Sequence, residues 1–143
     1  MLRILLILII PLSAFAGIKD KTYGSVIVAE VTSIYDADTF RVNIQDYPPI
    51  VGEHMSIRVL GIDAPEIRGK CESEKKRARQ AKQFTVQALR SAKIIELRNI
   101  KRGKYFRLLA NVYVDGQNLA QQLINAGHAR PYDGGKRAGW CNR

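Results

Sequence analysis

Residues 56–70 have the sequence SIRVLGIDAPEIRGK, and the interpretation of the whole chain starts from this stretch. Its first half is rich in strand-forming residues, and Pro65 then restrains the backbone and disfavours helix at the residue before it. The sequence therefore predicts a strand that ends in a stiff loop carrying Arg58, Asp63 and Glu66. A guanidinium and two carboxylates this close suit metal-assisted phosphate chemistry, in which a spare carboxylate accepts a proton from water. An ordinary surface turn is the alternative.

The N-terminus has the composition of a secretory signal peptide. A positive start, an apolar run from Ile4 to Ile10 and the small residues Ala14 and Ala16 fit that pattern. The apolar run is too short to span a bilayer. We therefore expect cleavage after residue 16, export to a periplasm or the medium, and no stable membrane insertion of residues 17–143. A buried N-terminal strand or an uncleaved anchor is the alternative.

Length, charge and cysteine content add three expectations. A chain of 143 residues suggests one domain, formed by residues 17–143 after signal cleavage. The net charge of +10 favours a polyanionic partner, although a merely basic secreted protein would also carry it. Cys71 and Cys141 are predicted to form a disulfide, because two cysteines in an exported chain usually pair. Free thiols or a shared metal are the alternatives, and Trp140 is expected to pack under the bond.

The hydrophobic pattern predicts five strands. Two of them lie within residues 22–43 and are separated by an acidic turn at residues 35–38. The third strand is expected at about 54–62, the fourth at 93–99 and the fifth at 105–114. Residues 46–53 contain two prolines and a glycine and are expected to be a loop.

A long helix is predicted between the third and fourth strands. Residues 72–92 contain no Gly or Pro and are rich in good helix formers. They also place Ala78, Ala81 and Leu89 on one face, opposite a basic face that is expected to be solvated. After the fifth strand, Asn118 is predicted to cap a short helix that stops at Gly127.

This order of elements predicts an α+β fold that is mainly β. The best match is a five-stranded OB-fold barrel with a long helix between strands 3 and 4 and short C-terminal helices. Barrels of this type bind oligonucleotides across the face of strands 2 and 3. Asp38, Arg58 and Asp63 are expected on that face.

Four segments of the sequence, taken in order and with their spacing, resemble the staphylococcal nuclease (thermonuclease) family. They are YDADT at 35–39, residues 58–66, KYFR at 104–107, and residues 119–127. The resemblance extends from about residue 26 to residue 127. It implies an OB-fold nuclease that cleaves DNA and RNA with calcium and leaves 3′-phosphate ends.

The same resemblance implies roles for individual residues. Asp38 and Asp63 match the metal-binding carboxylates, with the backbone carbonyl of Ala64 as a third ligand, and Glu66 matches the general base. Calcium prefers oxygen ligands of this kind and tolerates waters beside them. The following residues match phosphate-binding positions: Arg58 and Arg107 as clamps, Lys104 and Tyr105 as contacts to a terminal phosphate.

Each role has an alternative that stays open at this point. Asp38 could cap its own turn, Glu66 could be an ordinary surface carboxylate, and Arg58 could pair with Glu66 or with an aspartate. Arg107 could be a surface strand cation, and Tyr105 could belong to the core.

The expected protein is a monomeric, exported, calcium-dependent endonuclease acting on DNA and RNA. The rival is a catalytically silent OB-type module that only binds nucleic acid. The combination of Arg58, Asp63 and Glu66 argues against the rival, because a binding module needs no carboxylates near phosphate.

Overall fold

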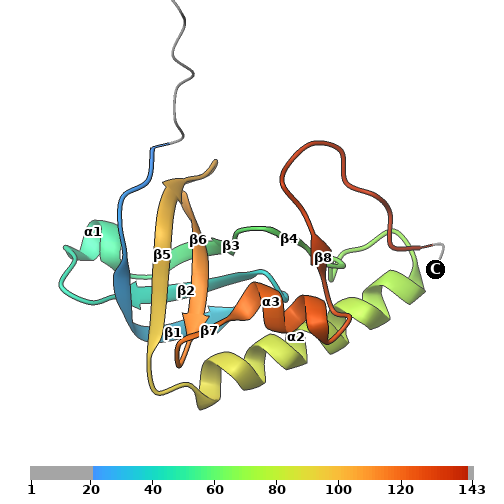
Figure 1. The fold of residues 1–143 in the computed structure, drawn as a ribbon, viewed down its shortest axis with the longest axis horizontal. Coiled ribbons are helices and arrows are strands. Elements are labelled where there is room, and N and C mark those ends of the chain that lie inside the picture. The colour runs from blue at the N-terminus through green and yellow to red at the C-terminus, as the bar shows by residue number, and fades with distance from the viewer. Residues whose placement is uncertain (1–20, 142–143) are drawn as a thin grey trace, which may run out of the picture.

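A computed structural model describes residues 21–141, and the predicted signal peptide at residues 1–16 lies outside the described residues. Five strands close into a barrel (Figure 1). They are β1 (Val26–Ile34), β2 (Thr39–Ile44), β3 (Met55–Val59), β5 (Ile95–Arg102) and β6 (Arg107–Val114). Antiparallel pairs join them in the order β3-β2-β1-β5-β6, and a parallel pairing of β3 with β6 closes the ring. The predicted five-stranded OB-type barrel is confirmed.

Backbone conformation explains where the strand boundaries differ from the prediction. The third strand ends at Val59, because Gly61 has a φ of +81° and breaks the run before β4 (Ile62–Asp63). The predicted fifth strand begins two residues late, at Arg107, because Tyr105 and Phe106 have φ values of +59° and +53° and form the turn from β5.

The fourth strand and the loop before β3 also differ from the prediction. β5 begins at Ile95 rather than at residue 93, because the backbone N–H groups of Lys93 and Ile94 donate to the Asp115 carboxylate. The predicted loop at residues 46–53 contains a one-turn helix, α1 (Pro49–Gly52). Proline is favoured at the first position of a helix, which explains why Pro49 can begin this helix.

The predicted long helix is present, and one short C-terminal helix lies within residues 21–141 where more than one was predicted. α2 (Glu72–Ser91) turns Ala78, Ala81, Thr85 and Leu89 inward. After β7 (Gln117–Asn118), the short helix α3 (Leu119–Asn125) begins where the Asn118 side chain accepts a hydrogen bond of 3.2 Å from the Gln121 N–H. No helix within residues 21–141 is both long enough and apolar enough to cross a membrane.

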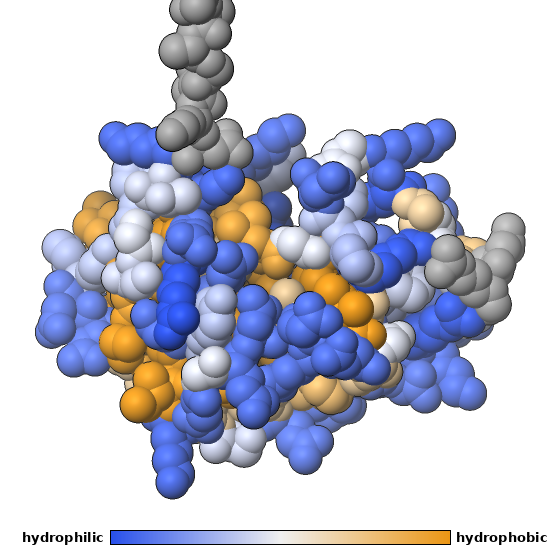
Figure 2. Space-filling view, in the orientation of Figure 1, coloured by the Kyte–Doolittle hydropathy of each residue, from blue (hydrophilic) through white to orange (hydrophobic). Residues whose placement is uncertain are grey.

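The chain beyond α3 returns to the loop that follows β3. β8 (Arg130–Pro131) pairs with β4 in a second, two-stranded sheet, so that Arg130 lies opposite Asp63. Residues 130–141, called the arm below, then run beside the N-terminal end of α2 (Figure 1). Hydrophilic side chains cover most of the face shown in Figure 2, and hydrophobic residues are visible between them.

Candidate active site

The acidic turn between β1 and β2 is buried and is held from two sides. Thr85 on α2 donates a hydrogen bond of 2.8 Å from its hydroxyl to the Ala37 carbonyl. The Asp38 N–H donates to the Asp36 carboxylate at 3.3 Å, and the Asp38 carbonyl accepts from the Val59 N–H at 2.9 Å. These contacts fix the Asp38 carboxylate beside β3, in a position with little access to water.

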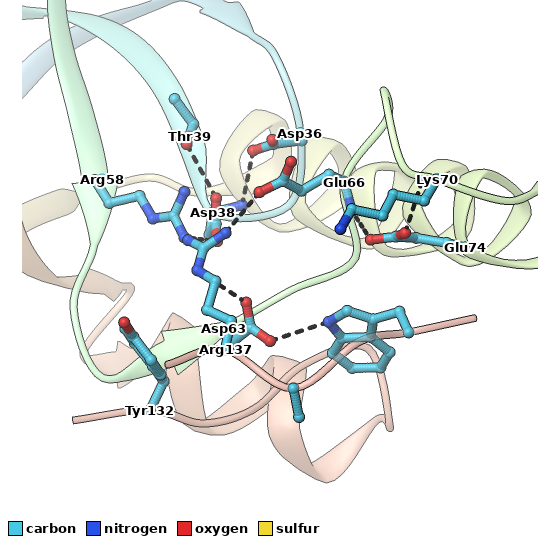
Figure 3. A network of polar contacts seen from close by, with 12 residues as sticks. Asp36, Asp38, Thr39, Arg58, Asp63, Glu66, Lys70, Glu74, Tyr132 and Arg137 are labelled. Carbon is cyan, nitrogen blue, oxygen red and sulfur yellow. Dashed lines mark hydrogen bonds and ion pairs between the residues drawn. The ribbon is translucent and has the colours of Figure 1, made fainter. Parts of the chain in front are cut away.

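Arg58 on β3 forms an ion pair with Asp38, with 2.8 Å between Nη2 and Oδ2 (Figure 3). Of the alternatives open for Arg58, pairing with an aspartate is therefore what the structure shows. Burial raises the pKa of Asp38 from 3.8 to about 7, with Arg58 opposing this shift and the neighbouring Asp36 adding to it. The Asp38 carboxyl therefore releases its proton only near neutral pH, even with Arg58 beside it.

Asp63 lies at the end of β4 and is surrounded by side chains of the arm. Its Oδ2 accepts hydrogen bonds from Arg130 Nε at 3.1 Å and from the Trp140 indole N–H at 3.0 Å. Its Oδ1 lies 3.3 Å from Arg137 Nε. Trp140 is buried as expected, but it also contacts a predicted metal ligand through its indole, which the sequence did not predict.

Glu66 projects from the loop after β4 toward the same cluster (Figure 3). Its side chain is 54% exposed, and its Oε1 lies 2.6 Å from Arg137 Nη1. The loop itself is held by Glu74, which is buried on α2 and accepts hydrogen bonds from the backbone N–H groups of Glu66 and Lys70. Glu66 thus combines a fixed backbone with a side chain that water can reach.

The predicted disulfide between Cys71 and Cys141 is present. Cys71 lies just before α2, and Cys141 lies at the end of the arm. The Ser73 hydroxyl adds a hydrogen bond of 3.3 Å to the Cys141 carbonyl. The arm is therefore fastened at residue 141 to the loop that carries Glu66.

Reduction of this disulfide is expected to lower the melting temperature. The bond closes a loop of 70 residues, for which the chain-entropy model gives about 4 kcal/mol of stabilisation. Thermal melting with and without reductant measures this effect, and the Cys71→Ser/Cys141→Ser pair should melt like the reduced parent. Reductant should not change the melting of that pair. Two free thiols in a non-reduced peptide digest would contradict the prediction.

A comparison with known families identifies the family of this chain. The sequence profile of the family described as "Staphylococcal nuclease homologue" matches residues 56–138, which is more than half of the chain. The chain belongs to this family. The matched residues include Arg58, Asp63 and Glu66 and extend into the arm, whereas Asp38 precedes them and is brought to the site by the fold.

Not every phosphate-binding residue implied by the staphylococcal nuclease family lies with the carboxylates. Arg107 lies beside Ser56 in the β3–β6 pairing and lines a cavity of about 360 Å³ together with Tyr47 and Phe106. Its Nε is buried and has no hydrogen-bond partner within residues 21–141. Among the described residues, the Arg107 guanidinium has no contact with Asp38, Asp63 or Glu66.

The turn between β5 and β6 carries the other two expected phosphate contacts. Tyr105 is 92% exposed, so core packing is wrong as an alternative for this residue. Lys104 is exposed beside it. Both side chains are accessible to a ligand, and neither has a described contact with Asp38, Asp63 or Glu66.

The residues predicted to bind a metal have the oxygen chemistry that a hard divalent cation accepts. Asp38 and Asp63 are buried carboxylates, and their oxygens pair with the guanidiniums of Arg58, Arg130 and Arg137. The Ala64 carbonyl, in the buried residue that follows Asp63, adds a neutral oxygen of the type that calcium accepts.

A second group of possible ligand atoms does not fit a metal. Within residues 21–141, Cys71, Glu74 and Cys141 place a ligand atom each within 4.8 Å of one another. The two sulfurs are joined as a disulfide, and thiolates are what a metal needs. Glu74 meanwhile uses its oxygens to hold the Glu66 loop. We assign this group a structural role.

Three residues of the site were missed by the sequence interpretation. Glu74 had a detectable signal, because it shares the inward helical spacing of Ala78, Ala81 and Thr85. Arg130 and Arg137 lie in a Gly-rich tail without periodicity, and nothing in their local sequence distinguishes them from the other cations of the chain.

Proposed function

We propose that this protein is an exported, calcium-dependent endonuclease that hydrolyses phosphodiester bonds of DNA and RNA and leaves 3′-phosphate ends. The observation that carries the proposal is the convergence of Asp38, Arg58, Asp63 and Glu66 at one edge of the barrel (Figure 3). Membership of the staphylococcal nuclease family supports the nucleic-acid substrate. Export rests on the signal-like composition of residues 1–16.

Asp38, Asp63 and the Ala64 carbonyl would hold the cation in this proposal. A bound divalent cation supplies Lewis-acid stabilisation of a phosphate oxygen. One carboxylate comes from the β1–β2 turn of the barrel and the other from β4, so the barrel and the β4–β8 sheet together set the distance between them. The protein contributes a rigid frame with buried charges, which is what electrostatic stabilisation of a transition state requires.

Glu66 acts as the general base, and Arg58 stabilises the charge that develops on the phosphate. Glu66 is suited to its role because its side chain is open to solvent, while Glu74 fixes its backbone. A carboxylate within hydrogen-bond reach of a water can remove the proton as the oxygen attacks phosphorus. The planar guanidinium of Arg58 can donate two parallel hydrogen bonds to nonbridging oxygens.

Incubation of the purified protein with plasmid DNA and with RNA tests this function directly. Calcium, magnesium and a chelator define three arms, and degradation only with calcium supports the proposal. Fragments that a polymerase can extend only after phosphatase treatment carry 3′-phosphates, because extension requires a free 3′-hydroxyl. Retention of nucleic acid without cutting in every arm would instead identify a silent binding module. The mass of the exported protein shows whether the chain begins at residue 17.

The calcium affinity of the free protein is expected to rise with pH up to about 7 and to level off above it. The pKa of Asp38 is raised from 3.8 to about 7, so below that pH this carboxyl carries a proton that must leave before its oxygen binds a cation. Displacement of one proton makes the affinity change by about tenfold per pH unit in this range.

Isothermal titration with calcium between pH 5.5 and 8.5 measures this dependence. Asp38→Asn is the matched variant, because it keeps the shape of the side chain but cannot titrate. It should bind calcium more weakly and with little change over the same range. An affinity of the parent that stays constant from pH 5.5 to 7 would contradict the prediction.

A further inference from the structure

Arg137 lies in a short loop of the arm that is fastened at both ends. Before it, the Tyr132 N–H donates a hydrogen bond of 2.9 Å to the Gly61 carbonyl, next to the β4–β8 pair. After it, Trp140 is bonded to Asp63, and the disulfide fixes residue 141. The loop between these attachments keeps the Arg137 side chain beside the acidic cluster, where its exposed fraction is 36%.

The contacts of Arg137 are with the two carboxylates that the proposed function needs. Its Nη1 lies 2.6 Å from Glu66 Oε1, and its Nε lies 3.3 Å from Asp63 Oδ1 (Figure 3). The side chain also lies over the Tyr132 ring, at 5.8 Å from its centroid. One guanidinium therefore bridges the proposed base and a proposed metal ligand.

Arg130 has the same charge but a different position. Its guanidinium donates to Asp63 Oδ2 and to the backbone carbonyls of Ala138 and Gly139. It also stacks over the Trp140 ring, at 4.0 Å from the centroid. These contacts hold the arm in place, so Arg130 is a structural residue. Arg137 has no comparable set of backbone contacts among the described residues.

In the proposed reaction, a bound cation would compete with Arg137 for Asp63. Oδ2 of Asp63 is already used by Arg130 and by the Trp140 indole, so Oδ1, which lies beside Arg137, is the oxygen left for a cation. Glu66 Oε1 contacts Arg137 Nη1, and this oxygen would have to exchange that contact for one with water to act as the proposed base. A guanidinium released from both contacts would lie close to an anion bound between the two carboxylates.

We propose that this anion is the scissile phosphate, and that Arg137 is a further catalytic residue of the site. The inference rests on the proposed function, and it adds to Arg58 a guanidinium of the arm that already contacts Asp63 and Glu66. A planar guanidinium can donate two hydrogen bonds to one phosphate, and Arg137 lies beside the same group of carboxylates as Arg58. The disulfide-closed loop then keeps the substrate-binding side chain of Arg137 in position.

Arg137→Ala should change turnover and calcium affinity in opposite directions. Loss of one positioned donor is expected to lower turnover by about 10²–10³-fold. Calcium should bind the DNA-free variant more tightly, by up to about fivefold, because a competing ion pair at a partly exposed position has been removed. Arg137→Lys should keep the calcium affinity of the parent but recover turnover only partly, because an ammonium lacks the planar fork.

The measurements are plasmid cleavage with calcium, calcium titration without DNA, and thermal melting. Lys93→Ala is the matched control, since it removes one exposed cation from the turn between α2 and β5 and should leave all three unchanged. Slower cleavage, tighter calcium binding and an unchanged melting temperature support the inference. Equal or faster cleavage by Arg137→Ala, or full activity of Arg137→Lys, would overturn it. A parent protein that never cuts would instead overturn the proposed function itself.

Discussion

Replacement of Glu66 by glutamine is expected to lower turnover by about 10²–10⁴-fold while nucleic-acid binding stays close to that of the parent. The amide has the size of the carboxylate but cannot accept a proton from water. The Glu66 side chain is 54% exposed, so its replacement leaves no buried group without a partner. The backbone contact that fixes the loop runs from the Glu66 N–H to Glu74 and does not involve the replaced group.

Initial rates of plasmid cleavage and the affinity for a short oligonucleotide in chelator measure the two parts of this prediction. Glu53→Gln makes the same chemical change at an exposed glutamate after α1 and should leave both unchanged. Near-parental turnover of Glu66→Gln would remove Glu66 from the mechanism. Weak binding by the variant would show that its effect is not confined to proton transfer.

Arg58→Ala is expected to cost about 3–4 kcal/mol of transition-state stabilisation, by analogy with the loss of one oxyanion donor. Arg58→Lys should also be poor, because a point charge cannot make the two-pronged contact with phosphate. The structure adds a complication, since Arg58 is also the ion-pair partner of the buried Asp38 at 2.8 Å. Part of any loss would therefore come from an unpaired Asp38 carboxylate.

A double-mutant cycle with Asp38→Asn separates the two roles of Arg58. If Arg58 acts on the phosphate, Arg58→Ala should still lower turnover in the Asp38→Asn background, provided residual cleavage is measured at saturating calcium. If it only neutralises Asp38, the second substitution should add nothing. Parental turnover of Arg58→Lys would show that the planar fork is not what Arg58 supplies.

The barrel was predictable because its strands and α2 carry clear hydrophobic periods. Phe40, Val42 and Ile44 alternate inward on β2, and Ala78, Ala81 and Leu89 follow the helical period on α2. The boundaries at Gly61 and Tyr105 were less accurate, because a left-handed residue can end a strand without a change in hydrophobic pattern.

The site was predictable only where its residues occur in motifs. Asp38, Arg58, Asp63 and Glu66 came from two short segments, and the structure brings them together. The arm was not predictable in the same way. Its contacts join residues 67, 71 and 77 positions apart in the sequence, and such pairs leave no mark on local spacing.

The arm also determines when the site can be completed. The side-chain partners described for Asp63 are Arg130, Arg137 and Trp140, and all three belong to the arm. A ribosome makes these residues after the five barrel strands, so Asp63 lacks every one of them until the end of the chain has been made. An incomplete chain therefore lacks the finished site. If the chain is exported as proposed, the site reaches its final form only after residue 141 has been translated and oxidation has joined it to Cys71.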